Sequence, residues 1–165
     1  ANAHDEVAVK KVFAIKKRSL DKPLSVIARD FEMITQVAEV QNKDLNIMKR
    51  HLSGPFTFIL DRRDEVLDTV SAKGKTVGVR MPDSALIKQI MAKVDFPLTA
   101  TSANLSGDTS LYSTDHLIAE FADHNSQPDL IIDAGQIPTR PPSTIVDLAS
   151  ATPQVLRQGP GEFKP

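Results

Sequence analysis

Segments with helical and with strand-like periodicity alternate along this chain, and this alternation limits the fold more than any other feature. Apolar residues recur at helical spacing in residues 5–18, 29–40, 42–52, 84–94 and 113–124. Strand-like runs lie between and after these segments, at residues 24–28, 56–60, 76–80, 97–101, 129–135, 143–149 and 154–159. Interleaved helices and strands predict an α/β (α+β) fold, a twisted sheet with flanking helices.

Local signals add detail to this fold. Asp30 and Asp83 stand where two helices begin, and we expect both to act as N-caps. The last two strand-like runs are joined only by residues 149–153, a connection short enough to predict an antiparallel pair. We therefore expect a mixed sheet.

Composition excludes several classes of function. A length of 165 residues favours a single domain, 1–165. The absence of cysteine excludes disulfides, cysteine-ligated zinc and thiol catalysis. A net charge of −1 argues against a generally basic nucleic-acid binder, and the lack of tryptophan leaves few platforms for base stacking.

Features that the sequence lacks lead to expectations about the location of the protein and its metal binding. No apolar run approaches the roughly 18 residues that cross a membrane, and no secretory signal is visible. We expect a cytoplasmic protein without membrane contact. His4, His51, His116 and His124 are scattered without metal-ligand spacing, so no metal site in the protein is expected.

Clustered cations and polar strand ends are the candidate functional features. The cations at 16–22 suit an anion clamp, but basic residues also complement the negative end of a helix. Arg80 closes an apolar strand, where it either binds a ligand or pairs with Asp83. The polar stretch 102–107 either lines a ligand site or satisfies its own backbone in a turn.

Six short motifs occur in an order that resembles the YrdC/TsaC family of threonylcarbamoyl-AMP synthases. They are "KKRSLDKPL" (16–24), "GPFTFIL" (54–60), "VGVRMP" (77–82), "SANLSG" (102–107), "STIVD" (143–147) and "LRQG" (156–159). The second and third motifs and the closing "GPGEFKP" also look like the YciO group. The resemblance implies a YrdC-like twisted mixed sheet with a large concave cavity.

The resemblance also implies roles for single residues. Catalytic roles are implied for Lys16 and Arg18. The nucleotide would be held by Arg18, Lys22, Thr76, Asn104, Ser113 and Arg157, with help from the region of Tyr112. Threonine would be held by Arg80, Ser102 and Ser143.

The activity implied by the family is the union of L-threonine, bicarbonate and ATP into threonylcarbamoyl-AMP and pyrophosphate. This adenylate feeds tRNA modification, so tRNA or tRNA-modification proteins are expected downstream. Mg²⁺ is expected to accompany ATP. The family pattern begins with an upstream segment that carries Pro-Thr-x-Thr-x-Tyr-Gly-Leu. Residues 1–165 lack it, so we expect a YrdC-like domain that is incomplete at its N-terminus.

Two other functions remain open at this point. The first is a non-catalytic, YciO-like module of the same fold that binds RNA or nucleotides through cations at 16–22 and 49–50. The second is a relative that transfers a carbamoyl group through carbamoyl-adenylate.

Overall fold

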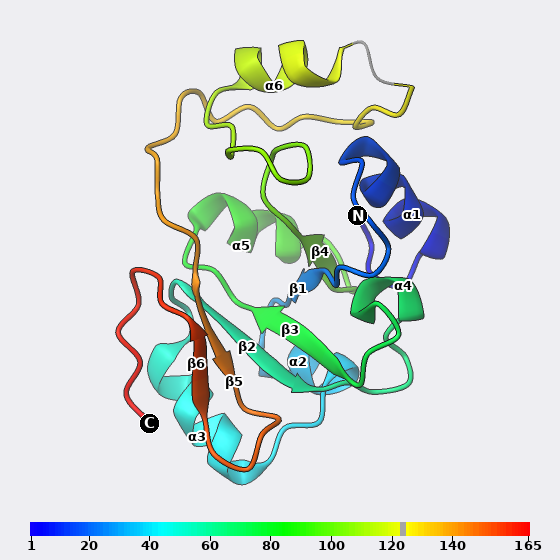
Figure 1. The fold of residues 1–165 in the computed structure, drawn as a ribbon. Coiled ribbons are helices and arrows are strands. Elements are labelled where there is room, and N and C mark those ends of the chain that lie inside the picture. The colour runs from blue at the N-terminus through cyan, green and yellow to red at the C-terminus, as the bar shows by residue number, and fades with distance from the viewer. Residues whose placement is uncertain (123–124) are drawn as a thin grey trace.

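A six-stranded mixed sheet forms the centre of the molecule in a computed structural model, which describes residues 1–122 and 125–165 (Figure 1). The strands run in the order β4-β1-β3-β2-β5-β6 across the sheet. Their bounds are β1 Ser25–Ile27, β2 Phe56–Asp61, β3 Thr76–Arg80, β4 Leu98–Ala100, β5 Thr144–Asp147 and β6 Gln154–Arg157. The pairs β1/β3 and β2/β5 are parallel. The pair β5/β6 is antiparallel, which confirms the predicted pairing.

Six helices accompany the sheet in the described residues. They are α1 Glu6–Ile15, α2 Phe31–Val37, α3 Asn42–His51, α4 Asp68–Ser71, α5 Ala85–Met91 and α6 Thr114–Phe121. Five of them match predicted segments, and the four-residue α4 was not predicted. None of the helices described is both long and apolar enough to cross a membrane. Residues 123–124, at the end of the last predicted helix, lie outside the described residues, and His124 is one of them.

Hydrogen bonds at the helix starts test the predicted caps. The Asp30 carboxylate accepts from the backbone amide of Met33 at 2.8 Å, so its capping role is confirmed. The prediction for Asp83 is wrong, because the Ser84 hydroxyl accepts from the amide of Ile87 instead. The Asp83 carboxylate pairs with Lys88 at 2.6 Å.

The strand predicted at 129–135 is not formed. This segment runs as an irregular chain beside α6, with Leu130 and Ile132 exposed (Figure 1). An apolar run becomes a strand only when another strand pairs with its backbone. None of the described strands pairs with this one.

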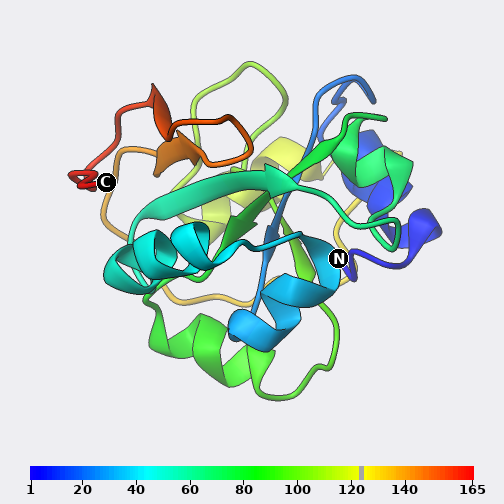
Figure 2. The same cartoon turned by 90° about the horizontal axis from the view of Figure 1, so that it is seen from below.

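One face of the sheet carries the hydrophobic core. Val26, Phe58, Val77, Val79 and Val146 are all buried at no more than 1% exposure. Helices α2, α3 and α5 lie on that side (Figure 2) and contribute Met33, Ile34, Met48 and Met91 to the same core. Because side chains alternate along a strand, the intervening residues point to the opposite face. That face carries the candidate site.

Candidate functional site

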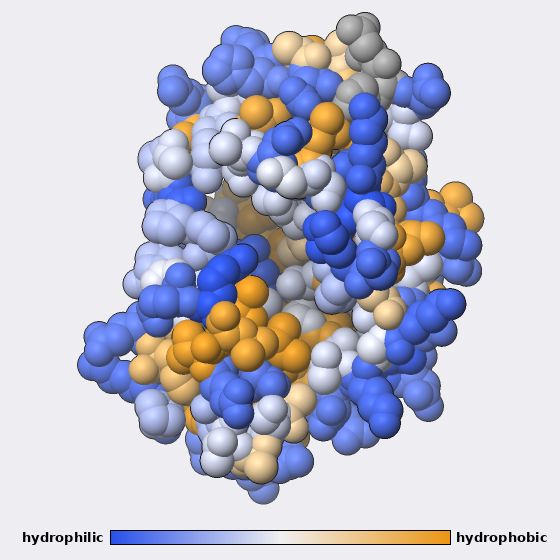
Figure 3. Space-filling view, in the orientation of Figure 1, coloured by the Kyte–Doolittle hydropathy of each residue, from blue (hydrophilic) through white to orange (hydrophobic). Residues whose placement is uncertain are grey.

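A cavity of about 810 Å³ opens on the second face of the sheet. It is visible as a hollow between the sheet and the layer that contains α6 (Figure 3). Its wall includes four arginines and a single acidic residue, Asp108. The arginines are Arg18, Arg80, Arg140 and Arg157. The local excess of positive charge favours an anionic ligand although the whole chain has a net charge of −1.

Neighbouring strands supply the floor of the cavity. Ser25 of β1 lies opposite Gly78 of β3, and Thr57 of β2 lies opposite Ile145 of β5. A Cβ atom at Gly78 would come within 2.8 Å of the Ser25 hydroxyl oxygen, so glycine leaves this floor open. Ser25 and Thr57 were not predicted as site residues. A hydroxyl inside an apolar strand signals a site only once the register with its neighbours is known.

Arg80 ends β3 at the cavity wall, as expected for a ligand-binding residue at a strand end. Its Nε atom is buried and has no hydrogen-bond partner, and the alternative pairing with Asp83 does not occur. Burial lowers the pKa of the guanidinium below its ordinary value, and the nearby charge of Arg157 lowers it further. A cation that is desolvated and repelled in this way gains much from an anionic partner.

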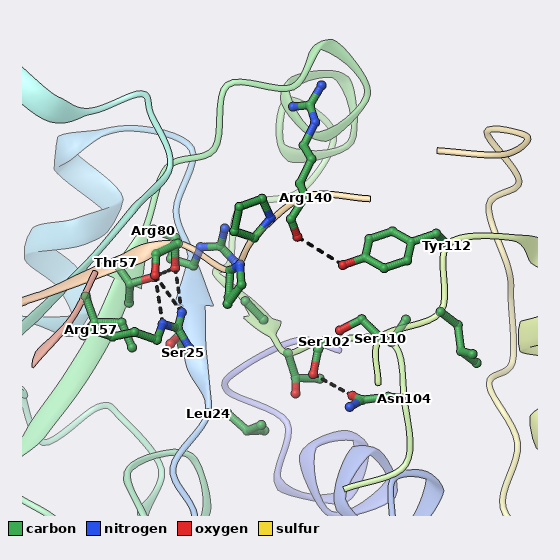
Figure 4. A pocket seen from close by; sticks show the side chains of 18 of the residues that line it. Leu24, Ser25, Thr57, Arg80, Ser102, Asn104, Ser110, Tyr112, Arg140 and Arg157 are labelled. Carbon is green, nitrogen blue, oxygen red and sulfur yellow. Dashed lines mark hydrogen bonds between the residues drawn. The ribbon is translucent and has the colours of Figure 1, made fainter. Parts of the chain in front are cut away.

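Arg157 lies beside Arg80 (Figure 4) and forms a second polar group with Ser143. The Arg157 guanidinium donates to the carbonyl of Ser143 at 2.7 and 3.0 Å. The Ser143 hydroxyl lies 2.8 Å from that of Thr57. These bonds hold β6, β5 and β2 in one arrangement at the cavity and orient the guanidinium without neutralising it.

Lys16 is joined to the stretch 102–104 rather than to its own helix. Its ammonium donates to the carbonyl of Ser102, the carbonyl of Asn104 and the side-chain oxygen of Asn104, at 2.5–2.9 Å. The Ser102 hydroxyl also donates to that side-chain oxygen at 2.6 Å. Each of the three N–H groups of the ammonium therefore has an acceptor. Lys16 is only 4% exposed and holds residues 102–104 of the wall from behind. Burial and the charge of Arg18 lower the pKa of Lys16 to about 8.

Arg18 lines the cavity from the loop after α1. Its Nε donates to the carbonyl of Lys22 at 3.2 Å and its Nη2 to that of Pro23 at 2.9 Å. Burial lowers the pKa of Arg18, whereas the charge of Asp21 raises it. No carboxylate pairs with Arg18 in the described residues, so its charge remains available to an anion.

The structure brings six of the predicted site residues to the cavity wall, and Lys16 directly behind it. The six are Arg18, Arg80, Ser102, Asn104, Ser143 and Arg157. Three others lie elsewhere. Lys22 is exposed, and Thr76 begins β3 at the end away from Arg80. The Ser113 hydroxyl caps α6 by accepting from the amide of His116.

A far wall that was not predicted as a whole completes the cavity. It comprises Leu111, Tyr112, Ile137 and Arg140, from the segments on either side of α6. No group of three or more histidine, aspartate or glutamate side chains is placed to hold a metal within 1–122 and 125–165.

Comparisons with known proteins agree with this geometry. The family model Sua5/YciO/YrdC, described as telomere recombination, matches residues 1–159. A putative threonylcarbamoyl-AMP synthase of Methanocaldococcus jannaschii is 35% identical over 96% of this chain and 73% of its own.

Solved structures agree as well. Pyrococcus abyssi Sua5 complexed with L-threonine is 34% identical, with a TM-score of 0.87 over 96% of this chain. This chain spans about half of that protein, 46%. Escherichia coli YciO is 26% identical, with a TM-score of 0.86 over 99% of this chain and 79% of its own. The sheet, the cavity and the family match lead to one conclusion: the chain belongs to the Sua5/YciO/YrdC family, which includes proteins named threonylcarbamoyl-AMP synthase.

Proposed function

We propose that the cavity binds L-threonine and ATP and joins them, with bicarbonate, into threonylcarbamoyl-AMP and pyrophosphate. The observation that carries this proposal is the Arg80 guanidinium, which is buried at Nε, has no acidic partner among the described residues, and is repelled by Arg157. A carboxylate matches the planar fork of an arginine in a bidentate pair. The P. abyssi protein that was crystallised with L-threonine has a similar fold and 34% identity, which supports threonine as the source of that carboxylate.

The proposed reaction has two steps. The amine of threonine first attacks the carbon of bicarbonate, and water leaves as an N-carboxylated threonine forms. A carbamate oxygen then attacks the α-phosphorus of ATP, and the bond to the β-phosphate oxygen breaks to release pyrophosphate. The nucleophile is already an anion, so positioning and charge stabilisation carry the catalysis.

Each group of residues has a part in this reaction. Arg80 would hold the threonine carboxylate, and the hydroxyls of Ser102 and Ser143 would orient its polar groups. Arg18 and Arg157 would stabilise the phosphates, with Asn104 beside them. Lys16 would act as a positioning residue, since its three hydrogen bonds go to the wall rather than into the cavity.

Magnesium would enter with ATP as part of the substrate. Mg²⁺ bound to a nucleotide keeps most of its ligands as phosphate oxygens and water and needs at most one or two protein carboxylates. Asp108, the one acidic residue on the wall, fits that need. The product would then pass to the machinery that modifies tRNA.

Pyrophosphate release tests the proposal. We expect release only when threonine, bicarbonate and MgATP are all present. Arg80→Ala should raise the KM for threonine by about thirtyfold or more, because a buried charge pair is lost. Arg63→Ala is the matched control, since Arg63 is exposed and lies outside the cavity wall. Release that is independent of threonine, or unaffected by Arg80→Ala, would contradict the proposal.

A further inference from the structure

Thr144 begins β5 immediately after Ser143, but its side chain faces away from the cavity. Its strand partner is Phe56, a core residue, whereas Ser143 and Ile145 on either side of it line the cavity. Thr144 has no exposed surface (0%). A polar side chain that is buried so completely needs hydrogen bonds inside the protein, and these bonds show what Thr144 holds.

The Thr144 hydroxyl joins the start of β5 to the chain that follows β6. It accepts from the amide of Gly159 at 3.0 Å and donates to the carbonyl of Gly161 at 2.7 Å. The same carbonyl also accepts from the side-chain amide of Gln158 at 2.9 Å. One buried hydroxyl, acting as acceptor and as donor, thus fixes residues 159–161 against β5.

The chain beyond this point is anchored to β2 and to the end of α3. In Figure 1 it turns back after β6 and runs beside that strand. Gly161 lies directly on the ring of Phe56, because a Cβ atom there would be 2.5 Å from the ring. The rings of Phe163 and His51 are 5.2 Å apart, and the His51 Nε2 atom lies 2.9 Å from the carbonyl oxygen of Lys164. Thr144 therefore connects β5 to a segment that is itself held in place.

The segment that Thr144 fixes begins at Arg157 of the cavity wall. The Arg157 guanidinium reaches back to the Ser143 carbonyl, at 2.7 and 3.0 Å, one residue before Thr144. Residues 143–144 and 157–161 are thus joined at neighbouring points on the two faces of the sheet. The path of residues 157–161 consequently determines where the guanidinium lies in the cavity.

We propose that Thr144 is a positioning residue for the reaction, which holds Arg157 and Ser143 in place from the core face without touching a substrate. This role rests on the proposed function, because Arg157 would stabilise the phosphates of ATP and Ser143 would orient threonine. Loss of the hydroxyl leaves the Gly159 amide without its buried acceptor, so the segment must shift to find another partner.

Calorimetric titration with MgATP and with L-threonine tests this role. Thr144→Val nearly keeps the volume of the side chain and removes both hydrogen bonds. We expect the Kd for MgATP to rise about tenfold through misplacement of Arg157. The Kd for L-threonine should rise about threefold, because Ser143 shifts as well. Thr144→Ser keeps the hydroxyl and should restore most of the affinity for both ligands.

Two control variants separate positioning from a general loss of stability. Thr69→Val is the same substitution at a buried hydroxyl oxygen that has no hydrogen-bond partner among the described residues. Val37→Ala, at a core position of α2 that is 1% exposed, lowers the Tm through a cavity far from the cationic side. Both variants should bind MgATP and L-threonine like the wild type, when all titrations are made well below the Tm of every variant.

Gln158→Ala provides a second test that does not depend on the folding of Thr144→Val. Gln158 is exposed, and its side chain donates to the same carbonyl of Gly161 that Thr144 holds. Its removal weakens the same attachment with little risk to the fold. We expect the Kd for MgATP to rise about threefold.

The outcomes distinguish this role from the proposed function. If the wild type binds both ligands and Thr144→Val binds them equally well, the role of Thr144 is overturned and the proposed function stands. Where Thr144→Val does not fold, an unchanged Kd in Gln158→Ala has the same meaning. Equal weakening in Val37→Ala, or in Thr144→Ser, also overturns the role, because the hydroxyl is then not the cause. A wild type that binds neither ligand contradicts the proposed function, and this role with it.

Discussion

Two cations show how burial sets the role of a residue in this cavity. Arg80 has a buried Nε without a partner, whereas Lys16 has an acceptor for each of its three donors. The first arrangement favours an incoming anion, and the second stabilises the wall. The family resemblance implied a catalytic role for Lys16 and threonine binding for Arg80, each a cation near a helix or strand end. It did not predict that the cavity wall accepts all three hydrogen bonds of Lys16, which join residues 86–88 positions apart.

The low pKa of Lys16 predicts a pH dependence. Since the folded pKa is about 8 against an ordinary value of 10.5, the unfolded chain holds more protons than the folded one between these values. Keeping Lys16 protonated in the folded protein therefore lowers the free energy of unfolding below pH 8. This penalty shrinks as the pH rises toward 10.5, so the folded protein gains stability over that range.

Nucleotide binding should change in the opposite direction. Above about pH 8 the loss of the ammonium removes a positive charge and one donor behind the wall. We expect the Kd for MgATP, measured by calorimetry from pH 7 to 9, to rise about fivefold, which corresponds to roughly 1 kcal/mol. Lys16→Met should bind more weakly throughout and lose this pH dependence. An unchanged pH profile in Lys16→Met would show that another group titrates.

Among the elements, β5 and β6 with their connections determine the geometry of the cationic side. Gly159, just after β6, packs so closely that a Cβ there would lie 2.2 Å from the carbonyl oxygen of Pro142 and 2.5 Å from the amide nitrogen of Thr144. These are backbone atoms and cannot move aside as a flexible side chain can. The amide of Gly159 also donates to the Thr144 hydroxyl at 3.0 Å.

Gly159→Ala should therefore displace Ser143 and Arg157 together. We expect a fall of about 2–3 kcal/mol in the free energy of unfolding, as for other forced backbone shifts, measured by urea denaturation. The KM for threonine should rise as well. Val155→Ala on β6, at a position 44% exposed, is the control and should change neither quantity much. If both variants behave alike, close packing at Gly159 does not position the site.

Elements with strong local signals were predictable from sequence. Asp30 and the apolar spacing of 29–40 together located α2, and charged residues bounded β2. The segment 129–135 was misjudged because strand formation depends on a distant partner, and α4 was missed because four residues carry little periodicity. Ser25 and Thr57 were not predicted as site residues for the same reason that the strand at 129–135 was predicted wrongly. In each case the outcome depends on how strands pair with one another.

A fold with its core on one face of the sheet leaves the other face free to bind a ligand. The core residues of β1, β2, β3 and β5 stabilise the sheet against α2, α3 and α5, so the polar face can carry unpaired arginines. Family resemblance predicted the site residues, and the fold determines which of them meet at the cavity. The fold does not bring Thr76, Lys22 or Ser113 to the cavity wall.

Ligand binding should stabilise the whole domain. MgATP at a hundredfold excess over its Kd should add about 2.7 kcal/mol to the free energy of unfolding, visible as a rise in Tm by calorimetry. The double variant Arg18→Ala with Arg157→Ala should lose most of this gain. An equal rise in Tm in the double variant would mean that the nucleotide binds outside this cavity.

If one cavity joins threonine, bicarbonate and ATP, the three must yield a single adenylate, which product analysis detects. The protein is incubated with L-threonine, ¹³C-labelled bicarbonate and MgATP, and the products are followed by ¹³C and ³¹P NMR. We expect a labelled carbamoyl carbon attached to an adenylate, with one pyrophosphate for each adenylate. Binding of ATP and threonine without any labelled adenylate would contradict it.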